Sequence, residues 1–187
     1  MCHTTTCRCG WCGAQCQNPP PVNPIIAATK PSLGVAVILE RLRQPSQWEA
    51  WRHTVRDVMV DDGRFTNHNG PKTLRDDGDA MQSLHAGLKV TLHVDEAEGY
   101  YLNLSSGAPV WFVMWRVDDE DPARAWPESV TLSYNEAGRL LDAQERVDNT
   151  PLPHEVAQWL QAFVDEHYRP EPKRRRRPES FKAPQDR

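Results

Sequence analysis

Four cysteines near the start of the chain have a spacing that could bind a metal. They form the pattern C-x-C-x2-C-x3-C and are Cys7, Cys9, Cys12 and Cys16. Zinc and iron prefer thiolate ligands, so the pattern predicts a zinc ion or a small iron–sulfur cluster, with Cys2 or His3 as a spare ligand. The alternative interpretation is a cysteine-rich tail that binds no metal.

All five cysteines of the chain lie within its first 16 residues. No disulfide can therefore staple a core formed by the rest of the chain, which fits a reducing compartment. The chain has no apolar run long enough for a membrane span and no hydrophobic stretch typical of an export signal. We therefore expect a cytoplasmic protein without membrane association.

A run of five basic residues near the C-terminus could hold an anionic partner. It consists of Lys173, Arg174, Arg175, Arg176 and Arg177. Five adjacent like charges repel one another, so we expect a disordered tail that docks on an acidic surface of a protein partner. Nucleic acid is the competing partner. The whole chain has a net charge of −4, and residues 168–187 contribute +5, so residues 1–167 have a net charge of −9. Nucleic acid is disfavoured because this negative charge would oppose approach to a phosphate backbone.

Residue types for hydrolytic chemistry are present, but their local pattern does not favour catalysis. Ser105 or Ser106 could be paired with one of the seven histidines, yet neither serine lies in a G-x-S-x-G elbow. Serines beside Gly107 and Pro109 are typical of a turn. The sequence also contains no phosphate-binding glycine loop, no HExxH and no EF-hand pattern. We therefore expect a protein that is not an enzyme.

The elements around these residues are predicted mainly as strands. The longest apolar run, residues 110–115, is apolar on both alternating faces and predicts a central strand preceded by a polar turn at residues 100–109. Further strands are predicted at residues 33–41, 51–60, 88–95 and 130–134, separated by a polar loop at 61–79 and an acidic loop at 118–127. The spacing of Trp48, Trp51 and Val55 leaves a helix open as the alternative for the second strand.

The end of the chain predicts an amphipathic helix. One stripe at spacings of three and four contains Val156, Trp159, Leu160, Phe163, Val164 and His167. Pro153 fits the first turn, and Pro170 ends the helix. Tryptophans in or beside the predicted elements are expected to fill the core.

These elements predict an α+β fold, mainly an antiparallel β-sheet arranged as a sandwich or a partly open barrel, with the C-terminal helix packed on it. Nine of the sixteen prolines lie within the first 31 or the last 20 residues of the chain. We therefore divide it into a Cys-rich and then Pro-rich extension at residues 1–31, a single domain at 32–168, and a basic disordered tail at 169–187.

Several segments together resemble the bacterial domain of unknown function family 3305. Residues 35–41 and 48–52 are similar to its V-x-V-x-L-E-R and W-x-x-W-R segments. A central Y-x-x-N-L-x-S-G-x-P run and the arginine after the next strand are matched by Tyr100, Asn103, Leu104, Ser106, Gly107, Pro109 and Arg116. The closing segments are matched by Glu136, Ala137, Pro153, Val156, Trp159, Phe163, Val164, His167 and residues 173–177.

The resemblance implies a context more than a mechanism. Members of this family are typically encoded beside a molybdenum-dependent formate dehydrogenase and its companions, and the family has no assigned catalytic residues. The resemblance extends from about Leu33 to Arg177, is poor over residues 62–87 and does not include the cysteine segment. The expected function is therefore a non-catalytic accessory protein that binds formate dehydrogenase or its operon companions. Metal binding or redox chemistry at the cysteines, and anion or nucleic-acid binding by the basic tail, are the alternatives.

Overall fold

The structure is a computed structural model that describes residues 30–46, 49–65 and 70–170. Seven strands and three α-helices follow one another along the described part of the chain. They are β1 (Ser32–Arg43), β2 (Trp51–Val60), β3 (Lys72–Asp76), β4 (Ala80–Thr91), α1 (Ala97–Ser105), β5 (Val110–Val117), β6 (Ala125–Thr131), α2 (Tyr134–Asp142), β7 (Arg146–Pro151) and α3 (His154–His167). A short 3₁₀ turn, η1 (Val94–Glu96), precedes α1.

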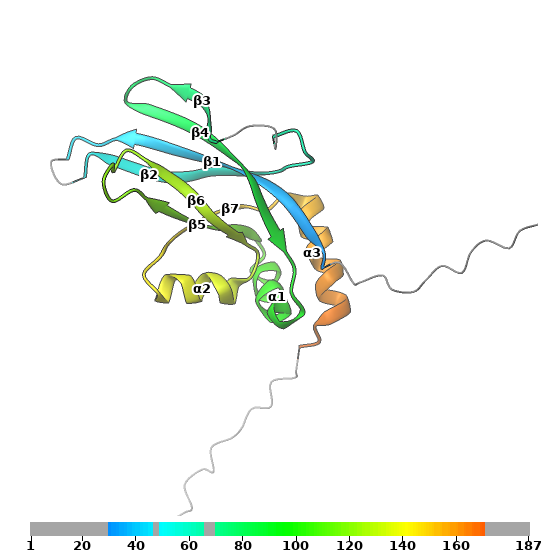
Figure 1. Ribbon diagram of the computed structural model, residues 1–187. Helices are drawn as coiled ribbons and strands as arrows, with labels where there is room; N and C mark the ends of the chain where they lie inside the picture. The colour runs from blue at the N-terminus through cyan, green and yellow to red at the C-terminus, as the bar shows by residue number, and fades with distance from the viewer. Residues whose placement is uncertain (1–29, 47–48, 66–69, 171–187) are drawn as a thin grey trace, which may run out of the picture.

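The strands form two antiparallel sheets that face each other (Figure 1). The four-stranded sheet has the order β2-β1-β4-β3, and the three-stranded sheet has the order β6-β5-β7. β4 lies beside β6 and β2 lies beside β7, so the sheets form a partly open structure and not a closed barrel. The predicted α+β class and mainly antiparallel arrangement are confirmed.

The core lies between the two sheets and continues under two helices. Alternate residues of β1 and β5 point into it, and Val35, Val37, Trp111 and Val113 are fully buried. Burying a side chain of this kind contributes about 1.5–3 kcal/mol to folding. The core therefore accounts for the strong apolar signal of both strands.

β5 is the central strand of its sheet, as predicted, with β6 on one side and β7 on the other. Its two faces are not equally covered. The Trp111 face is buried in the core, whereas Phe112 is only partly buried and makes an edge contact with Tyr134 of α2, with 6.2 Å between the ring centroids. The short helix α2 therefore provides the cover on the outer face.

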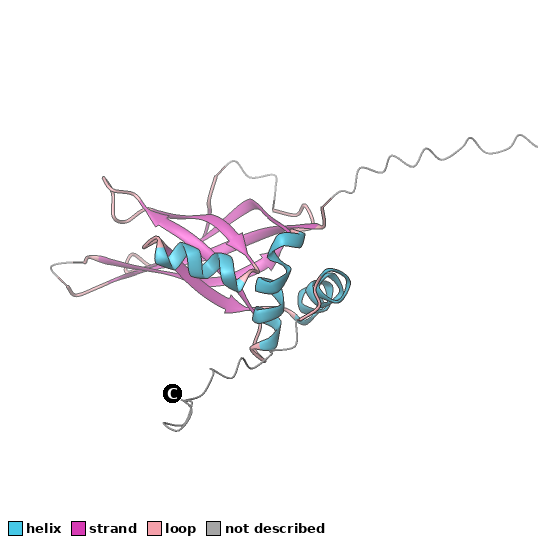
Figure 2. Ribbon diagram, turned by 90° about the horizontal axis from the view of Figure 1, so that it is seen from below, coloured by secondary structure: helices cyan, strands magenta, loops and turns pink. Residues whose placement is uncertain are grey.

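The C-terminal helix is also confirmed. Val156, Leu160, Phe163 and Val164 form its buried stripe and belong to the core cluster. Pro153 is the residue that caps the helix and does not lie in its first turn, because the φ and ψ of Pro153 are −59° and 147°. α1 packs against α3, and Figure 2 shows the helices gathered on one side of the sheets.

Several sequence-based boundaries were wrong, and the largest error concerns the segment before β5. The predicted polar turn at residues 100–109 is mostly the helix α1, and only its end, with Gly107 at φ +78°, is a turn. The predicted strand at 130–134 ends at Thr131, and Tyr134 begins α2. The predicted loop at 61–79 contains β3, and the strand predicted at 88–95 is β4, which begins at Ala80 and ends at Thr91.

Buried polar side chains explain how the chain turns between α1, β5, β6 and α2. Asn103 is 1% exposed, and its Nδ2 donates to the carbonyls of Val110 at 2.7 Å and Leu132 at 2.9 Å. Its Oδ1 accepts a hydrogen bond from the amide of Val110 at 3.0 Å. Asn103 thus supplies hydrogen-bond partners for backbone groups of Val110, the first residue of β5, and of Leu132, which directly follows β6.

Ser133 connects the two short helices. Its Oγ caps α2 by accepting from the amide of Glu136 at 3.1 Å, and it donates to the carboxylate of Glu96 at 2.5 Å. α1 passes so close to this cap that a Cβ added at Gly99 would lie 2.1 Å from the Ser133 oxygen. Only glycine therefore allows this approach.

The outer edge of the four-stranded sheet is β3. All five of its residues are exposed, including Leu74 at 45%.

Of the helices in the described ranges, none combines the length and apolar character that crossing a membrane requires.

Candidate functional site: an inter-sheet pocket

The site residues predicted from sequence lie outside the described residues. This holds for the four cysteines Cys7, Cys9, Cys12 and Cys16 and for the basic run at residues 173–177. Within the described ranges, no group of three or more His, Cys, Asp or Glu side chains is placed to hold a metal ion.

A different candidate site arises on the inner face of the four-stranded sheet. This face is apolar at Val35 and Val37 of β1 and becomes polar further along the same strand, at Arg41. Arg41 pairs with His53 of β2 on one side and with Met81 of β4 on the other, and Leu39 pairs with Ser83. The register therefore places these side chains side by side on one surface.

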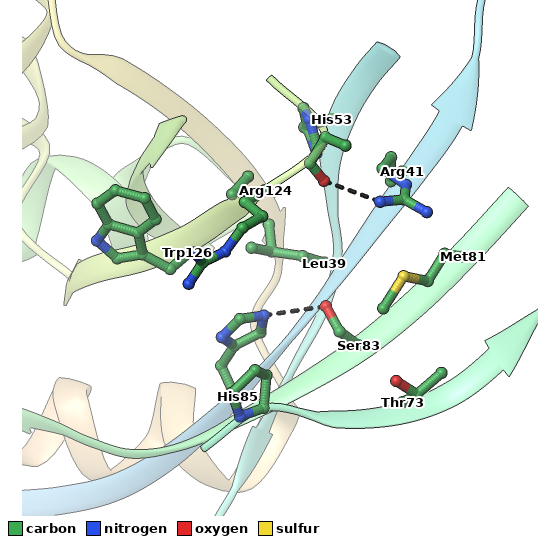
Figure 3. A pocket seen from close by; sticks show the side chains of 12 residues that line it. Leu39, Arg41, His53, Thr73, Met81, Ser83, His85, Arg124 and Trp126 are labelled. Atoms are coloured by element: carbon green, nitrogen blue, oxygen red, sulfur yellow. Dashed lines mark hydrogen bonds between the residues drawn. The ribbon is translucent and has the colours of Figure 1, made fainter. Parts of the chain in front are cut away.

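These side chains line a cavity of about 340 Å³, the inter-sheet pocket (Figure 3). Its polar lining consists of Arg41, His53, Thr73, Ser83, His85 and Arg124, and its apolar lining includes Leu39, Met81 and Trp126. Figure 3 shows Ser83 and Met81 on β4 and Arg124 across from them, with the Trp126 ring directed away from these side chains. The volume lies at the low end of the range for small-ligand sites.

The opposite wall is a tight loop between β5 and β6 that its own aspartates shape. Asp118 accepts from the amides of Glu120 and Asp121 at 2.9 and 3.3 Å, and Asp121 accepts from the amide of Ala123 at 3.0 Å. These backbone hydrogen bonds, more than the Arg124 guanidinium, lower the pKa of Asp118. The predicted acidic loop is thus a preorganised turn, with its carboxylates used for local structure.

Two side chains of the four-stranded sheet fasten this loop in place. Arg41 donates from Nη1 to the carbonyl of Ala123 at 3.0 Å, and the His53 ring donates from Nε2 to the carbonyl of Pro122 at 2.9 Å. The Arg41 guanidinium also stacks on the Trp51 ring at 4.4 Å. The loop that forms the opposite wall is therefore hydrogen bonded to β1 and β2 of the four-stranded sheet.

Ser83 and His85 form a second polar pair on the floor. The Ser83 Oγ and the His85 Nε2 are 2.9 Å apart. Burial lowers the pKa of His85, and burial is also the main reason why the pKa of His53 is lowered, with Arg41 and Arg146 acting in the same direction. Both rings are therefore neutral near pH 7.

The Ser83–His85 pair has the distance of a nucleophile and its general base. In hydrolytic sites a third group orients the base, usually a carboxylate. Among the described residues no carboxylate hydrogen bonds to the His85 ring, and the neighbouring groups are donors. What this geometry provides is a set of hydrogen-bond donors that converge on one small space.

Sequence reasoning did not identify this pocket. Met81, Ser83 and His85 alternate along β4 in the segment predicted as a loop up to residue 79 and left unassigned up to 87. One signal could have indicated the pocket. Residues on the inward face of a predicted strand continue at every second position beyond its predicted end, but with polar side chains in place of apolar ones. Arg41 ended the first predicted strand and was given no functional role.

The tryptophans are mostly core residues, as expected. Trp111 and Trp115 are buried, and Trp159 packs against the core. Trp126 differs, because it is only partly buried and lines the pocket. Its ring is turned away from the side chains of the four-stranded sheet (Figure 3), and its Nε1 donates to the Glu128 carboxylate at 3.0 Å.

Fold and site together define a small α+β protein of two facing antiparallel sheets with a cationic pocket between them. The family described as "Protein of unknown function (DUF3305)" has a model that matches residues 34–177 of this chain, and the protein belongs to that family. No curated protein and no solved structure matches the chain. The family membership expected from the sequence motifs is confirmed.

Proposed function

We propose that the protein is a cytoplasmic, non-catalytic accessory protein that binds a protein partner in a molybdenum-dependent formate dehydrogenase system and helps to assemble or maintain that enzyme. Its binding centre in this proposal is the inter-sheet pocket. The observation that carries the proposal is the convergence of Arg41, Ser83 and His85 on one cavity whose opposite wall is held by two hydrogen bonds. Donors held in this way favour binding of a guest group.

The formate dehydrogenase context is what the resemblance to the family implies, and the chain's charge distribution supports a protein partner. The basic run at residues 173–177 adds an attraction toward acidic surfaces that salt screens over about 10 Å at ~0.1 M. The net charge of −9 in residues 1–167 opposes a nucleic-acid backbone. The pocket and the tail would thus contact the same partner at two places.

Affinity purification from native cells tests this proposal. The full chain is tagged and compared with Arg41→Gln, with a variant in which all five basic residues 173–177 are changed to Gln, and with Arg64→Gln as a control. Arg64 is exposed, pairs with Asp62 at 2.7 Å and lies outside the pocket. We expect formate dehydrogenase or an operon companion to co-elute with the wild type and the control, and less of it with the two test variants.

Deletion of the gene provides the physiological measurement, and we expect formate oxidation to fall. Unchanged formate oxidation in every growth condition that expresses the operon would count against the proposal. Elution of nucleic acid in place of a protein would favour the alternative role of the basic tail.

The cysteine spacing favours a second candidate function, metal binding or redox chemistry at Cys7, Cys9, Cys12 and Cys16. Thiolates lose their protons when they bind a metal, so a real site should retain zinc or iron at neutral pH. The measurement is the metal content and visible absorbance of the full chain after anaerobic purification without added metal. Substoichiometric zinc and iron, unchanged when the four cysteines are replaced by serine, would remove this candidate.

A further inference from the structure

Arg41 is a partly buried cation for which the described residues provide no carboxylate. Among the residues that the structure describes, its guanidinium donates only to the carbonyl of Ala123 and stacks on Trp51, and its buried Nε has no hydrogen-bond partner. By contrast, six more exposed arginines each lie within salt-bridge distance of a carboxylate, namely Arg43, Arg64, Arg75, Arg116, Arg124 and Arg139. Buried charges are normally paired, so this cation is poised for an anion.

Neutral donors stand next to this cation. Met81 of β4 pairs with Arg41, and Ser83 lies two residues further along the same strand. The side chains of Arg41 and Ser83 are therefore diagonal neighbours on the same face of the sheet. Such neighbours have Cα atoms about 7–8 Å apart, and a group of two oxygens can bridge their side chains. The Ser83 hydroxyl can donate to that group while the His85 Nε2–H donates to the Ser83 oxygen, which their 2.9 Å separation allows.

The charge around the pocket indicates one negative charge on the guest. Arg41 and Arg124 are cationic, and Arg124 lies 3.6 Å from the ionised Asp118, so these three groups leave a net charge of +1. His53 and His85 add no charge near neutral pH. A carboxylate matches this charge, whereas a phosphate dianion exceeds it.

The remaining surface indicates what the carboxylate is attached to. Leu39 and Met81 line the cavity beside the donors, and about 340 Å³ accommodates a short apolar or aromatic stem. An acidic side chain of a polypeptide and a small free carboxylic acid both have this chemistry.

We propose that the inter-sheet pocket is a carboxylate-binding site in which Arg41 and Ser83 hold the two oxygens, and Leu39 and Met81 contact the stem. The inference rests on the proposed function, because it names the group by which the partner would be recognised. Arg41 is the specificity-determining residue of the site.

Titration of the full chain with defined probes tests the proposal. The probes are acetate, benzoate, inorganic phosphate, and N-acetylglutamate amide beside N-acetylglutamine amide, followed by NMR or calorimetry at pH 7.5. We expect saturable binding of benzoate and of the glutamate derivative, and weaker binding of phosphate and of the glutamine derivative. Benzoate should bind more tightly than acetate because it fills the apolar wall.

Variants locate the site and guard against misfolding. Arg41→Gln and Ser83→Ala should each weaken benzoate binding by about tenfold or more, since a hydrogen bond to a charged group is lost. Arg64→Gln removes the same charge elsewhere and should leave binding unchanged. Arg41→Lys keeps the charge without the planar fork, and we expect intermediate affinity and a wild-type melting temperature.

The outcomes separate this inference from the proposed function. No saturable carboxylate binding, or equal affinities in Arg41→Gln and Arg64→Gln, would overturn the inference even where partner capture depends on Arg41. Tight carboxylate binding by the pocket with undiminished partner capture by Arg41→Gln would support the inference and overturn the pocket's role in the proposed function. Binding of free acids without binding of the glutamate derivative would identify the guest as a small molecule.

Discussion

Asp148 of β7 connects the two sheets where β7 lies beside β2, a place at which the two strands do not pair as neighbours of one sheet. Its Oδ2 accepts from the amide of Val55 on β2 at 2.8 Å, close to the place where the β1–β2 register shifts between Ile38 and Leu39. Val55 is buried, so its amide has no access to bulk water. The Asp148 carboxylate therefore provides the Val55 amide on the edge strand β2 with the hydrogen-bond acceptor that a neighbouring strand would otherwise supply.

Replacing Asp148 with Ala should destabilise the protein by about 1–3 kcal/mol, because the buried Val55 amide is left unpaired. Asp148→Asn keeps an oxygen acceptor and should lose clearly less. Urea denaturation of the three proteins gives both values. Equal stability of Asp148→Ala and the wild type would mean that water satisfies this amide.

Asn103 has a similar role at the other end of the three-stranded sheet. Removing its side chain in Asn103→Ala breaks three hydrogen bonds to the backbone of Val110 and Leu132. We expect a loss of about 3 kcal/mol or more, since several buried groups lose their partners together. Asn149→Ala is the matched control, because Asn149 is exposed on β7 and should change stability by less than about 0.5 kcal/mol.

The close approach of α1 and α2 depends on the absence of a side chain at Gly99. In Gly99→Ala the new Cβ would lie 2.1 Å from the Ser133 oxygen and 3.1 Å from its Cβ, so the helices must separate or the cap of α2 must break. We expect a loss of about 1–3 kcal/mol, as for other overpacked sites.

Gly138 of α2 is the internal comparison for this substitution. A Cβ there meets nothing within 4 Å, so Gly138→Ala should be neutral or stabilise the helix by about 0.5–1 kcal/mol. Thermal denaturation of both variants measures the difference. A stabilising effect of Gly99→Ala would contradict the packing described for these two helices.

The secondary structure could be predicted where one face of an element is uniformly apolar. This condition holds for β5, for β1 and for α3, and their predicted positions are confirmed. α1 does not meet it, because Gly99 and Asn103 occupy its buried side and interrupt the apolar pattern. For α2 a signal was present and missed, since Ser133 and Glu136 form the S-x-x-E pattern of a helix start.

The family motifs have a structural explanation of the same kind. Asn103 and Gly107 of the central run end a helix and begin β5, and Ser106 donates to the carbonyl of Asn103 at 2.7 Å. Arg116 pairs with Glu145 at 3.1 Å. These residues of the central run do not line the inter-sheet pocket. Leu39 and Arg41, which do line it, belong to the segment that is similar to V-x-V-x-L-E-R, so the resemblance included two pocket residues without indicating that they form a site.

The pocket itself depends on the pairing of strands that are far apart in the sequence. Arg41, His53 and Ser83 come from three strands, and only the register of β2-β1-β4 brings them onto one surface. Nothing local at any of the three positions distinguishes an inward from an outward polar residue. The site could therefore be found only from the folded molecule.

Two neutral histidines in this pocket make the stability of the whole molecule depend on pH. The pKa values of His53 and His85 are lowered in the folded state, whereas in the unfolded chain both return to about 6.5. Below that value the unfolded state binds more protons than the folded state, so stability falls as the pH falls toward the lowered pKa values. Arg41 and Arg146 reinforce the lowering of the His53 pKa, whereas the hydrogen bond to the Pro122 carbonyl and, to a smaller extent, Glu49 oppose it.

Denaturant titrations between about pH 7.5 and 5 measure this dependence. We expect the wild type to lose stability over this interval, and the double variant His53→Gln, His85→Gln to lose less, because the two titrating groups are gone. Parallel profiles for the two proteins would show that the loss arises from other groups. Histidine NMR shifts would then assign the titration directly.

The exposed strand β3 bears on how the molecule behaves in a crowded solution. A free strand edge is a template for pairing with the edge of another copy, and β3 carries Leu74 at its centre. Lys72, Arg75 and Asp76 surround that leucine with charges, which oppose the docking of a like-charged edge. These charges therefore oppose aggregation along this edge, where the register of β3 against β4 also shifts between Thr73 and Arg75. Replacing the three charged residues with threonine should produce larger species in size-exclusion chromatography.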